Sequence, residues 1–229
     1  MAFGNGPKIV SDGLVFAIDA GDKNSYIGTG TSWKDISGNG ITQTLNNGTA
    51  YSPSNGGSMV FDGIDDWCNG PAFTLSSPTN SLSFNFWVKM TGSTSVNQEI
   101  IGKDGYGFPH LFIARVNSSD NIRFNWISGP SQISGFFTGT NNLWTNVQIT
   151  VSYGATSIAT FYKNGTYYGV DNGGTQDFPY TNSTLNIGGA GYGNFFTGNI
   201  SIVQIYNRAL SAQEVLQNYN ALKSRFNLT

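Results

Sequence analysis

The sequence predicts an all-β fold, a sandwich of two antiparallel sheets that ends in one short helix. Three observations lead to this prediction. Aromatic residues make up 14% of the 229 residues and glycine contributes 30, a mixture that favours short strands joined by tight turns. The clearest segments alternate apolar and polar residues with the period of two that is typical of a half-buried strand. Helical periodicity is confined to the end of the chain, in residues 206–226.

The first part of the chain contains two strand candidates separated by loop chemistry. GLVFAIDA (13–20) is a short apolar run that leads into the turn-rich GDKNSY. TSWKDISGNG (31–40) is rich in Asp, Ser, Asn and Gly, whose side chains bond to nearby backbone and so favour turns. GSMVFDG (57–63) then predicts a second strand that closes in a turn.

The middle of the chain carries the most regular alternation. In SLSFNFWVKM (81–90) one face would hold four apolar side chains and the other would hold Ser83, Asn85, Trp87 and Lys89. We expect this strand to bury the apolar face and to leave most of the second face in water. HLFIARVNSSDNIRFNWIS (110–128) predicts two strands around NSSDN.

The later strands include a hairpin. Alternation runs through 143–170, and Asn164-Gly165 lies between two apolar runs. Because both residues tolerate positive φ, this dipeptide predicts a two-residue hairpin turn. TLNIGG (184–189) and GNISIVQIYN (198–207) predict two more strands. A dozen or so strands without an internal repeat indicate one domain, residues 13–229, preceded by an N-terminal arm of residues 1–12.

The C-terminal helix, about residues 211–225, has a well-defined start. Ser211 is the expected N-cap, and Glu214 three residues later completes a capping box. Leu210 would pack against Val215 as a hydrophobic staple. The expected apolar stripe consists of Val215, Leu216, Tyr219, Leu222 and Phe226. An isolated helix of this length is marginal in water, so the stripe must dock either on this domain's own sandwich or on a neighbouring subunit.

Composition excludes several classes of function. Charged residues are 10% of the chain, the formal net charge is −2, and no basic block is present, so we expect no nucleic-acid partner. No apolar run approaches the ~20 residues of a membrane-spanning helix. Cys68 is the single cysteine, which excludes an internal disulfide. The first residues lack the charged and apolar regions of a signal peptide, so we expect synthesis in a host cytoplasm.

Four stretches, in order, resemble the laminin-G-like, concanavalin A-like jelly-roll domains. GLVFAIDAGDKNSY with TSWKDISGNG is similar to the opening strand and its Trp-x-Asp-x-Ser-Gly-Asn loop. GGSMVFDGIDDW is similar to a Phe-Asp-Gly-x-x-Asp-Tyr step, with Trp67 in place of Tyr. LWTNVQITVSYGATSIATFYKNGT and YNRALSAQEVLQNYN resemble the later hairpin and the closing strand and helix. The resemblance spans residues 13–220 and implies a jelly-roll sandwich.

The arm followed by one lone domain resembles the stand-alone jelly-roll proteins of tailed phages. This resemblance implies a non-enzymatic structural or adhesion protein of the virion, on the head as decoration or on the tail or baseplate. Its partners would be other virion proteins or its own copies in a homo-oligomer, with the arm and the terminal helix tying it to a neighbour.

A carbohydrate-binding module is the alternative, because aromatic rings on loops can stack on sugar faces. GKDGYGFPH and GGAGYGNFF place rings among glycines, and a rigid core would hold such loops at one rim. The candidate contact residues for a glycan or a protein partner are Tyr106, Phe108, Tyr192, Phe195 and Phe196. The same rings could instead plug the ends of the sandwich.

Glycoside hydrolysis is a remote alternative. The hydrolase branch of the fold carries Glu-x-Asp-x-x-Glu on one strand, and this pattern is absent. Of the two glutamates, Glu214 belongs to the helix cap and Glu99 is followed five residues later by Asp104. No sequence feature links Cys68 to His110, the single histidine, which we expect to open a strand. We therefore predict no enzymatic activity.

Two segments could hold calcium. Asp62, Asp65 and Asp66 lie within five residues, and calcium takes several oxygen ligands. Asp also favours turns, so the prediction is no cofactor, with one structural calcium ion here as the alternative. Asp35, Ser37 and Asn39 have the spacing of half a calcium loop, but Asn46 stands where an acidic ligand is required, so a polar turn is the favoured interpretation.

Overall fold

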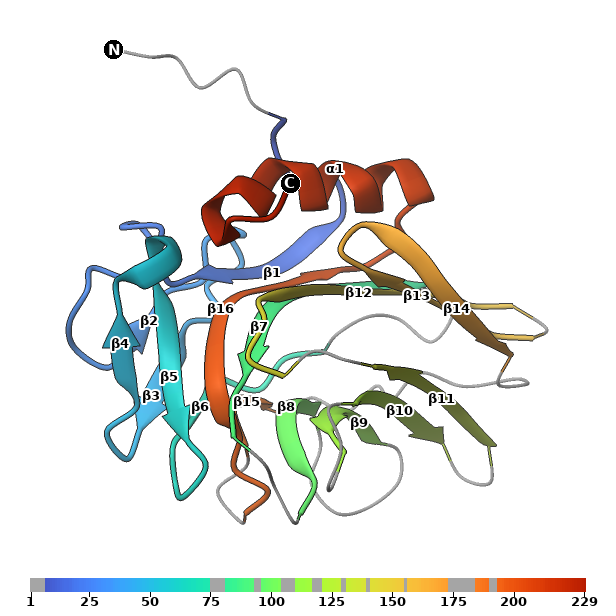
Figure 1. Ribbon diagram of the computed structural model, residues 1–229. Coiled ribbons are helices and arrows are strands. Elements are labelled where there is room, and N and C mark those ends of the chain that lie inside the picture. Colours follow the sequence, from blue (N-terminus) through green and yellow to red (C-terminus); the bar gives the residue numbers. More distant parts are fainter. Residues whose placement is uncertain are drawn as a thin grey trace.

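The computed structural model describes residues 7–74, 81–92, 96–103, 110–116, 121–128, 131–138, 141–154, 156–172, 184–189 and 193–229. Two eight-stranded sheets stack face to face, and the helix lies on the outer side of one of them (Figure 1). The strand pairs within both sheets are antiparallel. The predicted all-β sandwich with a single short C-terminal α-helix is confirmed.

Sheet A has the order β14-β13-β12-β7-β16-β5-β4, and β1 pairs with the second half of β16. Its strands are β1 (Leu14–Asp19), β4 (Ala50–Ser52), β5 (Ser58–Asp62), β7 (Leu82–Met90), β12 (Thr145–Ser152), β13 (Ile158–Lys163), β14 (Thr166–Asn172) and β16 (Thr197–Tyr206). Asn164 and Gly165 join β13 to β14 with φ of 51° and 73°, which confirms the predicted hairpin turn.

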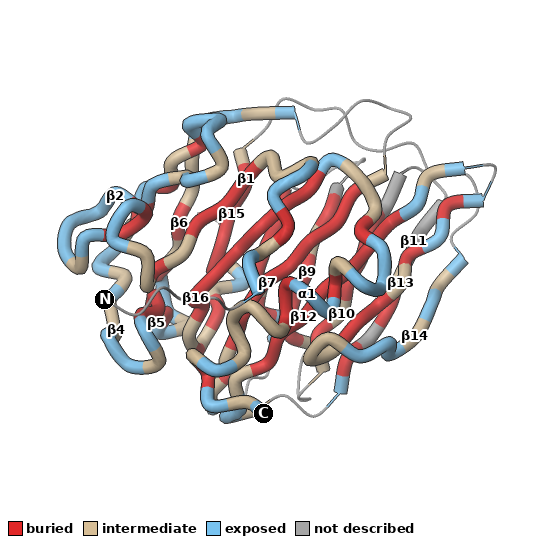
Figure 2. Tube along the Cα trace, turned by 90° about the horizontal axis from the view of Figure 1, so that it is seen from above, coloured by how far each residue is buried: buried red, intermediate tan, exposed pale blue. Residues whose placement is uncertain are grey.

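Sheet B has the order β11-β10-β9-β8-β15-β6-β3-β2. Its strands are β2 (Ser32–Trp33), β3 (Gln43–Asn46), β6 (Trp67–Asn69), β8 (Gln98–Lys103), β9 (His110–Arg115), β10 (Ile122–Ser128), β11 (Ser131–Phe137) and β15 (Leu185–Ile187). The main core lies between the sheets, and Figure 2 shows buried residues along the central strands.

The helical elements are η1 (Ser54–Gly56), α1 (Ala212–Leu222) and η2 (Lys223–Phe226). The predicted capping box is present, since the Ser211 side chain accepts from the Glu214 N–H and Glu214 accepts from the Ser211 N–H. Arg208 adds two bonds to the Glu214 carboxylate, and these bonds hold the pKa of Glu214 at about 2. Leu216 was predicted on the buried stripe but is 46% exposed, because α1 turns its neighbour Val215 toward the sheet.

The helix docks on its own sandwich. The Trp87 ring of β7 stacks on Phe226 and Tyr219, with ring centroids 4.1 and 5.8 Å apart. The described part of the arm packs beside it, where the Val10 N–H donates to Asn218 Oδ1 and the Val10 carbonyl accepts from the Tyr206 hydroxyl. These contacts favour docking within one chain over docking on a neighbouring subunit.

The covered face of sheet A corrects one expectation. Ser83, Asn85 and Trp87 were expected to lie mostly in water, but they are 1%, 0% and 0% exposed because the C-terminal segment 208–226, which includes α1, covers this face. The buried amides bond to one another and to the helix: Asn146 Nδ2 donates to Asn85 Oδ1, and Gln148 Nε2 donates to the Val215 carbonyl. A polar strand face is therefore buried without losing these hydrogen bonds.

One arginine fixes the C-terminal end. Arg225 Nη1 binds both carboxylate oxygens of Asp19 at 2.7 and 2.8 Å. Its other nitrogens donate to the carbonyls of Asn55 and Gly57 and to Ser201 Oγ. All five N–H groups of the guanidinium thus have acceptors, and the end of the helix is tied to β1, β16 and the η1 turn. No described helix combines the length and apolarity needed to cross a membrane.

Candidate functional site

The DISGNG loop is a polar turn. Asp35 Oδ1 accepts the N–H groups of Ala17 and Ser37, both at 2.9 Å, and Oδ2 accepts the Ile41 N–H at 3.1 Å. Ser37 Oγ also donates to Oδ2. Because backbone groups engage the carboxylate on both oxygens, the structure supports the turn interpretation over the calcium loop.

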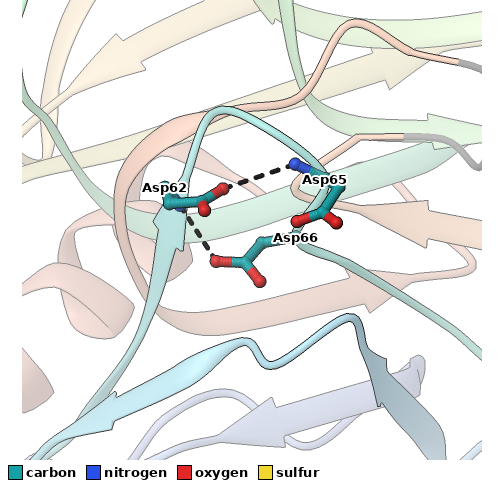
Figure 3. A group of neighbouring side chains, drawn as sticks. All are labelled: Asp62, Asp65 and Asp66. Carbon is teal, nitrogen blue, oxygen red and sulfur yellow. Dashed lines mark hydrogen bonds between the residues drawn. The ribbon is translucent and has the colours of Figure 1, made fainter.

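The three aspartates lie together at the turn between β5 and β6. One carboxylate oxygen from each of Asp62, Asp65 and Asp66 lies within 4.8 Å of the others (Figure 3). Asp62 Oδ1 accepts the Ile64 N–H at 2.8 Å, and Asp66 Oδ2 accepts the Asp62 N–H at 3.0 Å. Gly63 has a φ of 80°, a conformation that glycine adopts without strain and that shapes this tight turn.

The electrostatics of this turn suit a cation. Burial is the largest effect that raises the pKa of Asp66, and the charges of Asp62 and Asp65 raise it further. A divalent cation would relieve that repulsion, and the oxygen ligands match calcium chemistry. The Asp65 carboxylate makes no hydrogen bond among the described residues, so it is the ligand most available to an ion. The residues fit a calcium ion, which remains a prediction.

Two of the five predicted aromatic contact residues, Phe195 and Phe196, lie within the described residues. Tyr106, Phe108 and Tyr192 lie outside the described residues. Phe195 is partly buried beside Gly189. Phe196 is 0% exposed and packs edge-to-face on Phe61 at 6.2 Å, so it plugs the sandwich and is not accessible for contact.

The two aromatic segments also join strands at opposite ends of sheet B. The first segment follows Lys103, which pairs with Leu111 of β9 and with Leu185 at the start of β15. The second segment follows the other end of β15, where the Gly188 N–H bonds to the Ile100 carbonyl. The described residues that flank the two segments therefore lie at opposite ends of β8 and β15.

The outer face of sheet B, turned away from sheet A, carries a different set of side chains. Register assigns it, because the neighbours of these residues along each strand belong to the inter-sheet core. The set described below is mainly amide, hydroxyl and small, and it includes the rings of Trp67 and Phe112. It comprises Ser32, Thr44, Asn46, Trp67, Asn69, Glu99, Gly102, Phe112, Ala114, Arg123, Asn125, Ser134 and Asn186.

The rings and the charges of this face are only partly buried. Trp67, Phe112, Glu99 and Arg123 are all intermediate in exposure. The Arg123 guanidinium lies 5.1 Å from the centroid of the Phe112 ring. Burial raises the pKa of Glu99 to about 7, well above the usual value of a glutamate.

Sequence reasoning missed Trp67 and Phe112 as candidate contact residues. The available signal was alternation: in HLFIAR, Leu111 and Ile113 face the core, which leaves Phe112 on the opposite face. An aromatic residue on the polar side of an alternating strand indicates a contact surface. Of the other groups considered, Cys68 is buried and burial raises its pKa, and β9 begins at His110 as predicted.

Comparison with solved structures finds the same fold in binding domains. The receptor-binding domain of botulinum neurotoxin type G has a TM-score of 0.69 and 17% identity, over 91% of this chain and 51% of that one. The binding domain of Paraclostridial Mosquitocidal Protein 1 has a TM-score of 0.69 and 16% identity, over 92% and 52%. This chain thus spans about half the length of these domains.

A third similar structure matches over almost its full length. Domain 4 of AbnA, an extracellular arabinanase of Geobacillus stearothermophilus solved with arabinotriose, has a TM-score of 0.67 and 22% identity, over 90% of this chain and 98% of that one. No curated protein matches the sequence. The sequence model of the concanavalin A-like lectin/glucanases superfamily matches residues 62–216. The chain belongs to the concanavalin A-like lectin/glucanases superfamily.

Proposed function

We propose that the protein is a non-enzymatic module that binds neutral glycans on the outer face of sheet B. One observation carries this proposal: the two large faces of the sandwich differ. The outer face of sheet A is covered by α1 and sealed with stacked rings. No helix of the described chain covers the outer face of sheet B (Figure 1), which presents polar side chains and two partly buried rings.

The chemistry of that face suits an uncharged, hydroxyl-rich ligand. The side chains of Asn46 and Asn69 are partly exposed and are joined by a hydrogen bond of 3.1 Å. Amides offer both donors and acceptors, which is the requirement for binding sugar hydroxyls. Trp67 and Phe112 offer ring faces for the apolar side of a pyranose or furanose. The described part of the face carries one acidic and one basic residue, so a strongly charged ligand would find few partners there.

The similar structures support a binding role. One is the receptor-binding domain of a botulinum neurotoxin, one is the binding domain of a mosquitocidal protein, and one is an arabinanase domain solved with arabinotriose. Catalysis is not part of the proposal, because retaining glycoside hydrolysis requires two carboxylates about 5 Å apart. Glu99 is the one carboxylate that register places on the described outer face of sheet B.

Binding to a panel of soluble oligosaccharides, measured by isothermal titration calorimetry, tests the proposal. Arabinotriose, maltotriose and cellotriose are suitable neutral probes. We expect at least one to bind, and we expect Trp67→Ala and Phe112→Ala to weaken it at least about tenfold, as for truncated aromatic anchors. Tyr167→Ala is the matched control, since Tyr167 is 60% exposed on sheet A. No binding to any neutral saccharide, with the fold intact by circular dichroism, would contradict the proposal.

Attachment to a phage particle, through virion proteins or further copies of this chain, stays a prediction. A glycan-binding module on a particle would serve adhesion to a host surface, which is compatible with the proposed function. Mass spectrometry of purified virions tests it directly. Recovery of this chain at many copies per particle is the expected result, and its absence from purified particles would contradict the assignment.

A further inference from the structure

The outer face of sheet B is most open at one end. Ala114, Asn125 and Asn186, on β9, β10 and β15, are 3%, 4% and 7% exposed, so little of their surface is available to a ligand. At the end formed by β2, β3 and β6, in contrast, every residue of this face is at least partly exposed. This end comprises the exposed Ser32 and Thr44 and the partly exposed Asn46, Trp67 and Asn69.

Trp67 differs from the other four tryptophans of the chain. Trp33, Trp87 and Trp126 are 0% exposed, and Trp144 uses its indole N–H in a hydrogen bond. Trp67 is partly exposed, and its indole N–H has no acceptor in the described chain and is not fully buried. Both the ring and the N–H donor of Trp67 are therefore accessible to a ligand, a combination that is typical of aromatic residues at binding surfaces.

Two amides beside Trp67 are held in a fixed orientation. Asn46 Nδ2 donates to the Thr44 carbonyl and to Asn69 Oδ1, both at 3.1 Å. Because a carbonyl only accepts, Asn46 must turn its nitrogen toward Thr44, and Asn69 must present its oxygen to that nitrogen. Asn69 Nδ2 and Asn46 Oδ1 are then left without partners in the described chain, and neither atom is fully buried. A donor and an acceptor are thus held next to each other at the surface.

Strand register places these groups in one compact patch. Asn46 pairs with Trp67, and Thr44 pairs with Asn69. Neighbouring strands are about 4.8 Å apart, and residues two apart on one strand are about 7 Å apart, so the four side chains cover an area similar to that of one sugar ring. Ser32 pairs with Thr44 and continues the polar row to β2, at the edge of the sheet.

We propose that one sugar ring of the glycan stacks on Trp67 and that its hydroxyl groups bond to Asn69 Nδ2 and Asn46 Oδ1. The hydroxyl groups of Thr44 and Ser32 contact the next unit of the glycan as it passes over β2. None of these five side chains is charged, which suits a neutral sugar. This inference rests on the proposed glycan-binding function and assigns the position of the sugar and its polar contacts.

Asn69→Ala tests the amide contact. The substitution removes the free Nδ2 donor, and Asn46 keeps its bond to the Thr44 carbonyl, so the strand pair should be retained. Asn172→Ala is the matched control, because Asn172 is an exposed asparagine on β14 of sheet A. We expect Asn69→Ala to weaken binding of arabinotriose, maltotriose or cellotriose, whichever binds the native protein, about tenfold. Asn172→Ala should leave the affinity unchanged, and both variants should unfold near the native urea midpoint.

The side-chain signals of the tryptophans test the stacked ring in the native protein. Each indole N–H gives its own signal in spectra of ¹⁵N-labelled protein, and Trp67→Phe identifies the signal of Trp67. We expect the bound trisaccharide to shift this signal and to leave the signals of the buried Trp33, Trp87 and Trp126 in place.

Native affinity in Asn69→Ala, or a Trp67 signal that stays in place while the trisaccharide binds, would overturn this inference. In either case, binding by the native chain would leave the proposed function standing. Absence of binding by the native chain to every neutral saccharide tested would overturn both.

Discussion

The Glu99 carboxyl occupies a position that stabilises its protonated form. Its pKa rises from 4.5 to about 7 through burial, so the folded chain binds this proton more tightly than the unfolded chain does. The corresponding stability is fully present below pH 4.5 and is lost as the pH rises through about 7. This shift in the pKa of Glu99 corresponds to at most about 3 kcal/mol in the free energy of unfolding.

Glu99→Gln tests this titration. We expect the variant to be more stable than the native protein at pH 8 and similar to it at pH 5, measured by urea unfolding at each pH. Glu214→Gln is the control of opposite sign, because the bonds from Arg208 lower the pKa of Glu214 to about 2. The stability that the ionised Glu214 carboxylate adds to the fold is present above pH 4.5 and is lost as the pH falls through about 2. Equal pH profiles for native and Glu99→Gln proteins would show that the carboxyl titrates normally.

The aspartate turn gives a second prediction for single residues. We expect millimolar calcium to raise the melting temperature by about 3 °C, as for a weakly bound stabilising ion. Asp65→Asn should abolish the shift without breaking the turn, because the carboxylates of Asp62 and Asp66 hold the turn's N–H groups. Asp12→Asn, an equal charge change at an exposed ion pair, should keep the shift. A melting temperature that does not change when calcium is added would contradict the predicted calcium site.

The terminal helix belongs to the fold and is not a mobile appendage. Phe226 is 3% exposed and stacks on Trp87, while Trp144 packs against it at 4.8 Å. We expect Phe226→Ala to lower the free energy of unfolding by about 3–4 kcal/mol, the usual cost of deleting a buried ring. Leu216→Ala, at a 46% exposed position of α1, should cost well under 1 kcal/mol. Chemical denaturation measures both, and equal losses would contradict a docked helix.

Local chemistry determined which of these elements could be predicted from the sequence. The Ser211–Glu214 box and the Asn164-Gly165 turn were predictable because neighbouring residues form them. The burial of Asn85 was not, since alternation cannot show that a helix more than a hundred residues later covers that strand face. For the same reason, the position of Arg123 relative to Glu99 depends on strand register, which composition does not encode.

The whole molecule has two different large faces, and β14 is one of the edge strands of its open sheets. Among the described strands β14 pairs only with β13, and its side chains Tyr167 and Val170 are 60% and 51% exposed. Ile158 at the start of the neighbouring β13 is 38% exposed. β14 has neither lysine nor proline, the residues that usually prevent edge pairing. A net charge of −2 offers little repulsion between copies.

We therefore expect two copies to associate through β14. Val170→Lys should convert a dimer into a monomer in size-exclusion chromatography with light scattering. Ile64→Lys, at a 73% exposed position on the aspartate turn, should leave the mass unchanged. A native chain that stays monomeric at high concentration would contradict the association.

The proposed binding of a ligand to sheet B follows from the difference between the two outer faces of the sandwich. Nuclear magnetic resonance tests the position of this binding surface most directly. Titrating ¹⁵N-labelled protein with the neutral trisaccharide that binds should shift the amide signals of Gly102, Ala114 and Asn186, whose positions strand register places on the outer face of sheet B. Signals from α1 and β14 should stay in place. Shifts confined to α1, β14 or the aspartate turn, with the signals of sheet B unmoved, would show that the contact surface lies elsewhere.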